Sequence, residues 1–215
     1  MSETSKPSSG SFPTTSDDSA VNGNSSAPAN SDALRKVTGE IERAAGEYGW
    51  DKPPSLYALV RTAELLETPG LPSDVEVSLR EAWDGSPDHL SAVLQESLGA
   101  DTLEELLPQI EWPSTVEGAA VTVERLIAPP QVEDEAPEDP QEATEFIAAH
   151  PLSSEVRITA GVTRGGDSWC EIRSRAHDHP DSVGKGPDLV PALVQGLKMG
   201  FAPADDWSTP AETRP

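Results

Sequence analysis

The stretch Glu155-Val-Arg-Ile-Thr-Ala-Gly-Val-Thr-Arg-Gly-Gly-Asp-Ser-Trp-Cys-Glu-Ile-Arg-Ser-Arg-Ala176 decides the fold, because it has the pattern of a β-hairpin. Apolar and polar side chains alternate over residues 156–163 and again over residues 169–175, which is typical of strands with one buried face. Gly165 and Gly166 lie between the two strands and supply the positive φ angles that a tight turn needs. We therefore expect an antiparallel strand pair at the centre of the protein.

The register of this hairpin follows from the face that is buried. A two-residue loop would pair Ile158 with Arg173 and mix apolar with charged side chains on one face. A three-residue loop, residues 164–166, pairs Ile158 with Ile172 and leaves one face uniformly apolar. We therefore predict the three-residue loop, which commonly combines a type I turn with a glycine bulge.

The same register has two further consequences. Ala160 lies opposite Cys170 on the apolar face, so the thiol is expected to pack as a small hydrophobic group rather than to act as a nucleophile. Glu155 lies opposite Arg175, and such a cross-strand charge pair contributes roughly 0.2–1 kcal/mol.

The second face of the hairpin is expected to be exposed. It carries the charged and aromatic side chains Arg157, Trp169, Glu171, Arg173 and Arg175. Arg and Trp are enriched at the energetic centres of protein interfaces, so this face is the first candidate interaction surface. The alternative is that these arginines pair within the chain, with Glu155, Glu171 or the acidic segment 133–139.

Composition narrows the classes of partner. The chain has 215 residues, with 15 Lys and Arg against 38 Asp and Glu, a net charge of −23. A surface this acidic disfavours nucleic acid and anionic membranes, both of which attract clustered Lys and Arg. One cysteine excludes an intrachain disulfide and fits a reducing compartment. No apolar run approaches the roughly 20 residues of a membrane span, and we predict a cytoplasmic protein.

Periodicity and turn residues predict the architecture. Residues 1–31 and 202–215 are expected to be disordered tails around a single α+β domain, residues 32–201, with an exposed acidic loop at 129–140. Helices are expected at 32–47, 73–84, 101–112, 140–149 and 188–200, and strands at 55–66, 90–97, 117–128 and in the hairpin. For residues 55–66 a helix is the alternative. The predicted sheet has five strands, mainly antiparallel or mixed, with helices on one face, in the order α-β-(α)-β-(α)-β-α-β-β-α.

Four stretches of the chain together resemble a family of actinobacterial proteins without an established activity. They are residues 49–66, residues 110–113 with 118–125, residues 169–178 and residues 186–194. That resemblance implies a single cytosolic domain and no catalytic residue. If the helices at 73–84 and 101–110 are treated as insertions, the element order is also similar to the small, acidic, dimeric secretion-chaperone fold. Fold similarity does not establish function, but it favours a binding role.

Two histidines next to the hairpin carry the strongest catalytic alternative. His177 and His179 flank Asp178, and Asp181, Glu171 and Cys170 lie near enough in sequence to add metal ligands. A transition-metal site needs such ligands to converge from more than one element, whereas neighbouring residues on an extended segment diverge. A solvated loop without a metal is therefore the prediction.

These observations favour a non-catalytic cytosolic binding or adaptor protein, chaperone-like in character and without a cofactor. Its partner is predicted to be another protein or a second copy, bound by the exposed hairpin face. The alternatives are a metal-assisted hydrolase that uses His177 and His179, and a small-molecule sensor with a ligand between sheet and helices.

Overall fold

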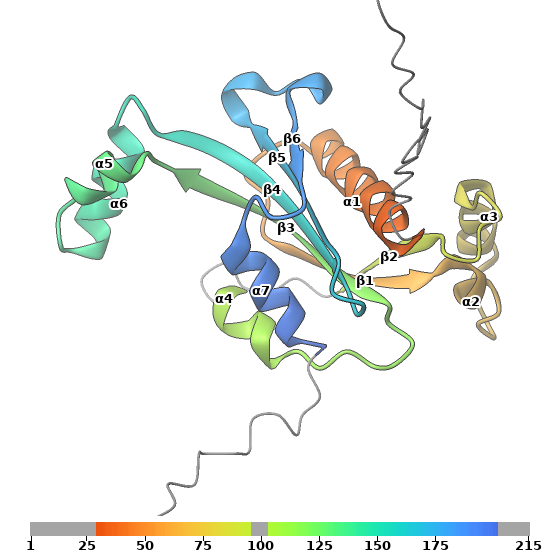
Figure 1. Cartoon of the computed structure of the whole chain (residues 1–215). Helices are drawn as coiled ribbons and strands as arrows, with labels where there is room; N and C mark the ends of the chain where they lie inside the picture. The colour runs from red at the N-terminus through yellow and green to blue at the C-terminus, as the bar shows by residue number, and fades with distance from the viewer. Residues whose placement is uncertain (1–28, 96–102, 202–215) are drawn as a thin grey trace, which may run out of the picture.

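A six-stranded antiparallel sheet forms the centre of the protein in the computed structural model, which describes residues 29–95 and 103–201 (Figure 1). The strand order is β2-β1-β3-β4-β5-β6. The strands are β1 (Ser55–Arg61), β2 (Leu90–Leu94), β3 (Gly118–Ile127), β4 (Ser154–Thr163), β5 (Ser168–Ser174) and β6 (Gly184–Gly186). The prediction of an α+β domain is confirmed, with six strands instead of five. Tail residues 1–28 and 202–215 lie outside the described residues.

The additional strand, β6, escaped prediction because it has three residues, two of them glycine. Such a segment has no side-chain alternation to read. It pairs with β5, and Glu171 lies opposite Lys185 in that ladder.

Helices lie on both faces of the sheet, which corrects the prediction of one covered face (Figure 1). They are α1 (Ala29–Glu47), α2 (Thr62–Leu66), α3 (Ser73–Ala82), α4 (Leu103–Leu106), α5 (Pro130–Asp134), α6 (Pro140–Ala149) and α7 (Pro191–Met199). α1 covers one face, and α4 and α7 cover the other. α5 and α6 lie at the far end of the long β3–β4 ribbons (Figure 1).

The hairpin has the predicted register. Ile158 pairs with Ile172 and Ala160 with Cys170, and residues 164–166 form the loop. Of the two loop glycines, Gly166 adopts a positive φ of 95°. The confirmed register shows that the buried apolar face outweighs the preference for a two-residue turn.

Two clusters of apolar side chains make the core. The larger lies between the sheet and α4 and α7, and it includes Val121, Ile158, Ala160, Cys170 and Leu197. The smaller lies between the sheet and α1, where Leu34, Val37 and Ile41 pack against β1, β2 and β3. Central strands such as β3 and β4 are therefore buried on both faces.

Several local predictions differ from the structure at element boundaries. α1 begins at Ala29 rather than Asp32. The segment 55–66 is a strand as far as Arg61 and continues as α2. The acidic segment 129–140 contains α5, which begins at Pro130 and buries Val132. α7 begins at Pro191, because proline favours the first helical turn, and Asp188 does not cap it.

Candidate functional site

The hairpin face that was expected to be exposed lies beneath α1. Arg157, Glu171 and Arg173 are buried, Trp169 is half-buried, and Arg175 is exposed. The expectation of a free Arg-rich face was therefore wrong for its central residues. A strand pattern shows that two faces differ in polarity, but it does not show whether a polar face meets water or another element.

Arg173 is held by a carboxylate from α1. Its Nε and Nη2 donate to the two oxygens of Glu42, at 2.5 and 2.7 Å, in a bidentate arrangement. Both side chains are less than 10% exposed. The Nη1 atom of Arg173 also donates to Asp178 at 3.2 Å. The pairing was anticipated as an alternative, but its acidic partners come from α1 and the loop after β5.

Glycines bring α1 close enough to the sheet for these pairs to form. A Cβ at Gly39 would lie 3.2 Å from Oε1 of Glu171, and a Cβ at Gly46 would lie 3.7 Å from Arg173. On the strand side, a Cβ at Gly161 would lie only 2.7 Å from the hydroxyl of Thr38. The helix therefore packs directly onto charged side chains because three positions lack a side chain of their own.

Arg157 occupies the end of the same face, near the last turn of α1. Its Nε and Nη2 donate to Oε1 of Glu124 at 3.3 and 3.0 Å, and Nη2 also donates to the carbonyl of Gly49. The other oxygen of Glu124 accepts from the amides of Asp51 and Lys52. The Arg157–Glu124 pair thus fixes the turn that links α1 to β1.

Trp50 sits at the centre of that turn. The guanidinium carbon of Arg157 lies 4.3 Å from its ring centroid, and that of Arg175 lies 5.5 Å away. Its indole N–H donates to Asp178 at 2.8 Å. Arg175 in turn binds both carboxylate oxygens of Asp51 and also Glu155, which confirms the predicted cross-strand pair. The turn is therefore held by one cluster of six side chains, those of Trp50, Asp51, Glu155, Arg157, Arg175 and Asp178.

We expect Trp50→Phe to raise the pKa of Asp178. The indole hydrogen bond is the main cause that holds this pKa below its usual range, with Arg173 second. A carboxyl group with a depressed folded-state pKa stabilises the protein above its unfolded pKa, and the contribution is lost as the pH falls through the folded value. An NMR titration of the Asp178 carboxyl carbon measures the change.

Trp83→Phe is the matched control for this prediction, because its indole donates to the Ser86 carbonyl at a distant site. It should leave the pKa of Asp178 where it is in the parent protein. Equal titration curves for the parent and Trp50→Phe would contradict the assignment.

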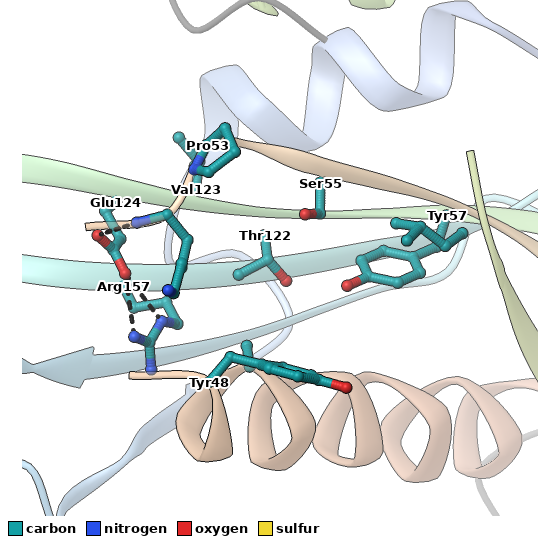
Figure 2. Close-up of a pocket in the computed structure, with 11 residues that line it drawn as sticks. Tyr48, Pro53, Ser55, Tyr57, Thr122, Val123, Glu124 and Arg157 are labelled. Carbon is teal, nitrogen blue, oxygen red and sulfur yellow. Dashed lines mark hydrogen bonds and ion pairs between the residues drawn. The ribbon is translucent and has the colours of Figure 1, made fainter. Parts of the chain in front are cut away.

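Beside the last turn of α1, the same sheet face forms a pocket of about 330 Å³ (Figure 2). Figure 2 shows the side chains of Ser55, Tyr57 and Thr122 on the sheet side and Tyr48 on the helix side, with Arg157 and Glu124 at one end. We call it the hydroxyl pocket. Its full lining is Ala45, Tyr48, Lys52, Pro53, Ser55, Tyr57, Leu94, Thr122, Val123, Glu124 and Arg157.

The electrostatics of the hydroxyl pocket favour neutral hydrogen bonding. Burial raises the pKa of the Tyr57 phenol, so the hydroxyl stays protonated at neutral pH. Arg157 is 1% exposed, and its charge is balanced by Glu124. The Nη1 atom of Arg157 is buried without a hydrogen-bond partner among the described residues. Such an unsatisfied donor costs roughly 1–3 kcal/mol.

The two candidate metal ligands lie apart from this pocket. Both are exposed after β5: His177 ends one short 3-10 turn, and His179 caps the next, where its Nδ1 accepts from the amide of Asp181. Within residues 29–95 and 103–201, no three His, Cys, Asp or Glu side chains converge as a metal site would require. Cys170 and Glu171 point to other partners in the sheet.

Cys170 is expected to react only when the domain opens. It is free and completely buried in the larger core, and burial raises the pKa of its thiol. Because the thiolate is the nucleophile, iodoacetamide should label the native protein roughly 1,000-fold or more slowly than the urea-unfolded chain, for a domain of ordinary stability. Mass spectrometry over time measures both rates. Equal rates would show that the thiol is accessible.

Of the residues that line the hydroxyl pocket, only Arg157 was singled out from the sequence. Tyr57 and Thr122 appear in apolar strand patterns as ordinary strand residues, and Glu124 appears as a solvent-facing charge. The available signal was Trp50-Asp-Lys-Pro-Pro54, an aromatic and charged turn before two prolines. Only the partner strands show that this turn anchors one end of a pocket.

Of three comparisons with known proteins, one finds a match, to a protein family. No curated protein and no solved structure matches the chain. No helix among the described residues is long and apolar enough to cross a membrane. The model of the family described as PPA1309-like protein matches residues 34–202, which include most of α1, the whole sheet and α7. The chain therefore belongs to the PPA1309-like protein family.

Proposed function

We propose that this protein is a non-catalytic cytoplasmic binding protein whose ligand occupies the hydroxyl pocket. One observation carries the proposal: α1 packs mainly on β4 and β5, and beside its last turn the sheet face over β1 and β3 is left hollow. The first prediction placed binding on the hairpin, but that surface is occupied by α1. We therefore propose that binding occurs in this hollow on the same face, beside the last turn of α1.

The chemistry of the hydroxyl pocket supports binding rather than a reaction. It combines apolar walls with a few polar groups, as ligand pockets generally do. Its hydroxyls from Tyr57 and Thr122 offer donors and acceptors. The single free cysteine fits a reducing cytoplasm. A chaperone-like role, which the element order suggested, remains one form of this proposal.

Filling the hydroxyl pocket tests the proposal. Ala45 lies on α1 and lines the pocket, so Ala45→Phe should occupy the space without removing a hydrogen bond. Isotope-labelled protein is screened by NMR against a library of small polar fragments. Hits should shift the amides of Ser55, Tyr57 and Thr122, and Ala45→Phe should abolish these shifts.

Ala148→Phe is the control, since Ala148 is exposed on α6, at a distance from the pocket. It should bind the same fragments as the parent protein. The proposal fails if no fragment shifts these amides, or if Ala45→Phe binds them as well as the parent does.

A further inference from the structure

Within the part of the chain that the structure describes, the edge strand β2 lacks the features that normally protect a sheet edge. It is the terminal strand of the sheet, and its sequence Leu-Ser-Ala-Val-Leu contains no charge and no proline. Val93 and Leu94 are exposed, Leu94 at 62%. Natural edges are usually blunted by lysine, proline, a bulge or covering structure. The opposite edge, β6, is three residues long and carries Lys185.

Alternate residues of β2 present their backbone groups outward. The amide of Gln95 donates to the carbonyl of Leu56, and the amide of Thr62 donates to the carbonyl of His89. In an antiparallel ladder the bonded residues alternate along each strand, so the odd-numbered residues face β1. The N–H and C=O groups of Leu90, Ala92 and Leu94 therefore face the free edge.

Three pockets follow the same residues at strand spacing. Leu90 lines a pocket of about 250 Å³ near the start of α1, Ala92 lines one of about 430 Å³ between α1 and α3, and Leu94 lines the hydroxyl pocket. The β2 residues that line successive pockets are thus two positions apart, which is roughly 7 Å along a strand. A strand added beside β2 would place every second side chain next to one of these pockets.

A buried histidine gives independent support for a ligand at this edge. His89 is 4% exposed and lines both the first and the second pocket. Its Nδ1 lies 2.7 Å from the hydroxyl of Thr62, while its Nε2 is buried without a hydrogen-bond partner among the described residues. An unsatisfied buried polar atom is unfavourable, and a polar group from a ligand would relieve it once the imidazole ring turns toward the pocket.

Charge selects the kind of ligand. The middle pocket has apolar walls from Ile41 and Leu79, and Glu40 and Asp74 add a carboxylate from each helix. Basic side chains beside apolar ones suit this combination. A second copy of the chain would carry a net charge of −23 to a surface of the same sign, and such like charge opposes association.

We propose that β2 binds an extended peptide segment, rich in basic and apolar residues, as a seventh strand of the sheet. The backbone of Leu90, Ala92 and Leu94 pairs with the peptide, and the three pockets take its alternate side chains. This is the mode in which main-chain bonds give affinity and pockets give specificity. The inference rests on the proposed function and names the class of its ligand.

Ala92→Pro against Ala92→Ser is the decisive comparison. Proline at 92 removes an outward N–H and leaves the β1 ladder intact, and proline is tolerated at such edge positions. Serine keeps that N–H. The full chain is used to select 12-residue peptides from a random display library, and selected peptides are synthesised. Affinity should fall about tenfold or more in Ala92→Pro and stay within about twofold in Ala92→Ser, as expected for lost edge hydrogen bonds.

A peptide-side measurement keeps the test valid if Ala92→Pro fails to fold. Single N-methyl groups are placed along the selected peptide, and each version is bound to the parent protein. Methylation at alternate positions should weaken binding about tenfold, with little effect between them, because only alternate amides face β2. Uniform sensitivity, or none, would overturn a strand-addition mode.

The remaining outcomes separate this inference from the proposed function. It is overturned if the library yields no basic-apolar peptide, if Ala92→Pro binds as tightly as the parent, or if light scattering shows a dimer that Ala92→Pro dissociates. In any of these cases, fragments that still bind the hydroxyl pocket and are lost in Ala45→Phe leave the proposed function standing. If neither fragments nor peptides bind the protein, both the proposed function and the strand-addition mode are overturned.

Discussion

Arg173→Ala is expected to destabilise the protein by roughly 3–5 kcal/mol, because it leaves the Glu42 carboxylate buried beneath α1 without its partner. The bidentate pair at 2.5 and 2.7 Å supplies both oxygens of Glu42 with donors. Removing one member of a buried ion pair destabilises a protein strongly, because the remaining charge is buried without a partner. Replacing both members by apolar residues of similar size changes the stability far less. Urea unfolding followed by circular dichroism measures the loss.

Two variants show whether burial causes the effect. Arg80→Ala breaks an exposed pair with Glu76, four residues apart on α3, and should cost only about 0.3–0.5 kcal/mol. The double replacement Glu42→Leu with Arg173→Met should recover most of the stability lost in Arg173→Ala, because it leaves no uncompensated charge. If Arg173→Ala is no more harmful than Arg80→Ala, the pair is not buried in solution.

A side chain at Gly161 is expected to separate α1 from the sheet. In Gly161→Ala, the new Cβ would lie 2.7 Å from the Thr38 hydroxyl and 3.0 Å from Cδ1 of Leu34. Both residues are buried on α1, so the helix has to shift, and overpacking of this kind costs typically about 1–3 kcal/mol. Gly161→Val should lie at the upper end of that range, in the same unfolding assay.

The matched glycine substitution is Gly165→Ala in the hairpin loop. A Cβ there would have Thr163 as its nearest neighbour at 3.6 Å, an ordinary contact, and its φ is not positive. This variant should change the unfolding free energy by less than about 0.5 kcal/mol. Adding Thr38→Ala to Gly161→Ala should restore part of the loss, because it removes the closest atom. An additive double mutant would contradict close contact as the cause.

These variants separate the stabilising half of the α1-side face from the binding half. Over β4 and β5, the arginines are matched by acids from α1, from β3 and from the turn after β5. Over β1 to β3, polar groups face pockets instead, and Arg157 is shared by both halves. Loss of stability without loss of binding is therefore expected from substitutions at Arg173, provided that the domain remains folded under the assay conditions.

Local sequence patterns predicted much of the sheet. The hairpin register came from matching apolar residues across two strands, and Ile158 does pair with Ile172. The helix after Asp139 begins as its proline and acidic residue indicated, with Asp139 accepting from the amides of Gln141 and Glu142. Side-chain alternation and capping depend on neighbours a few residues away, so a single sequence contains them. β6 is too short for that information.

The candidate site depended on contacts that no local pattern contains. Glu42 and Arg173 are 131 residues apart in the chain, and Arg157 reaches Gly49 over 108 residues. A run of Arg and Trp on a strand looks the same whether it faces solvent or a helix, because alternation reports only a difference between faces. Gly39 and Gly46 allow α1 to approach the sheet closely, but glycine in a helix does not indicate which surface it will meet.

The sequence by itself determined the hairpin, its register, the burial of Cys170 and an α+β domain with a strongly acidic surface. Tertiary structure decided that α1 covers the Arg-rich face, that helices lie on both sides of the sheet, and that β1 to β3 carry the open pockets. The physical reason is the distance along the sequence between the residues that interact. Backbone periodicity and turns are fixed by residues close in sequence, whereas the pairing of buried charges is decided by which distant element packs above them.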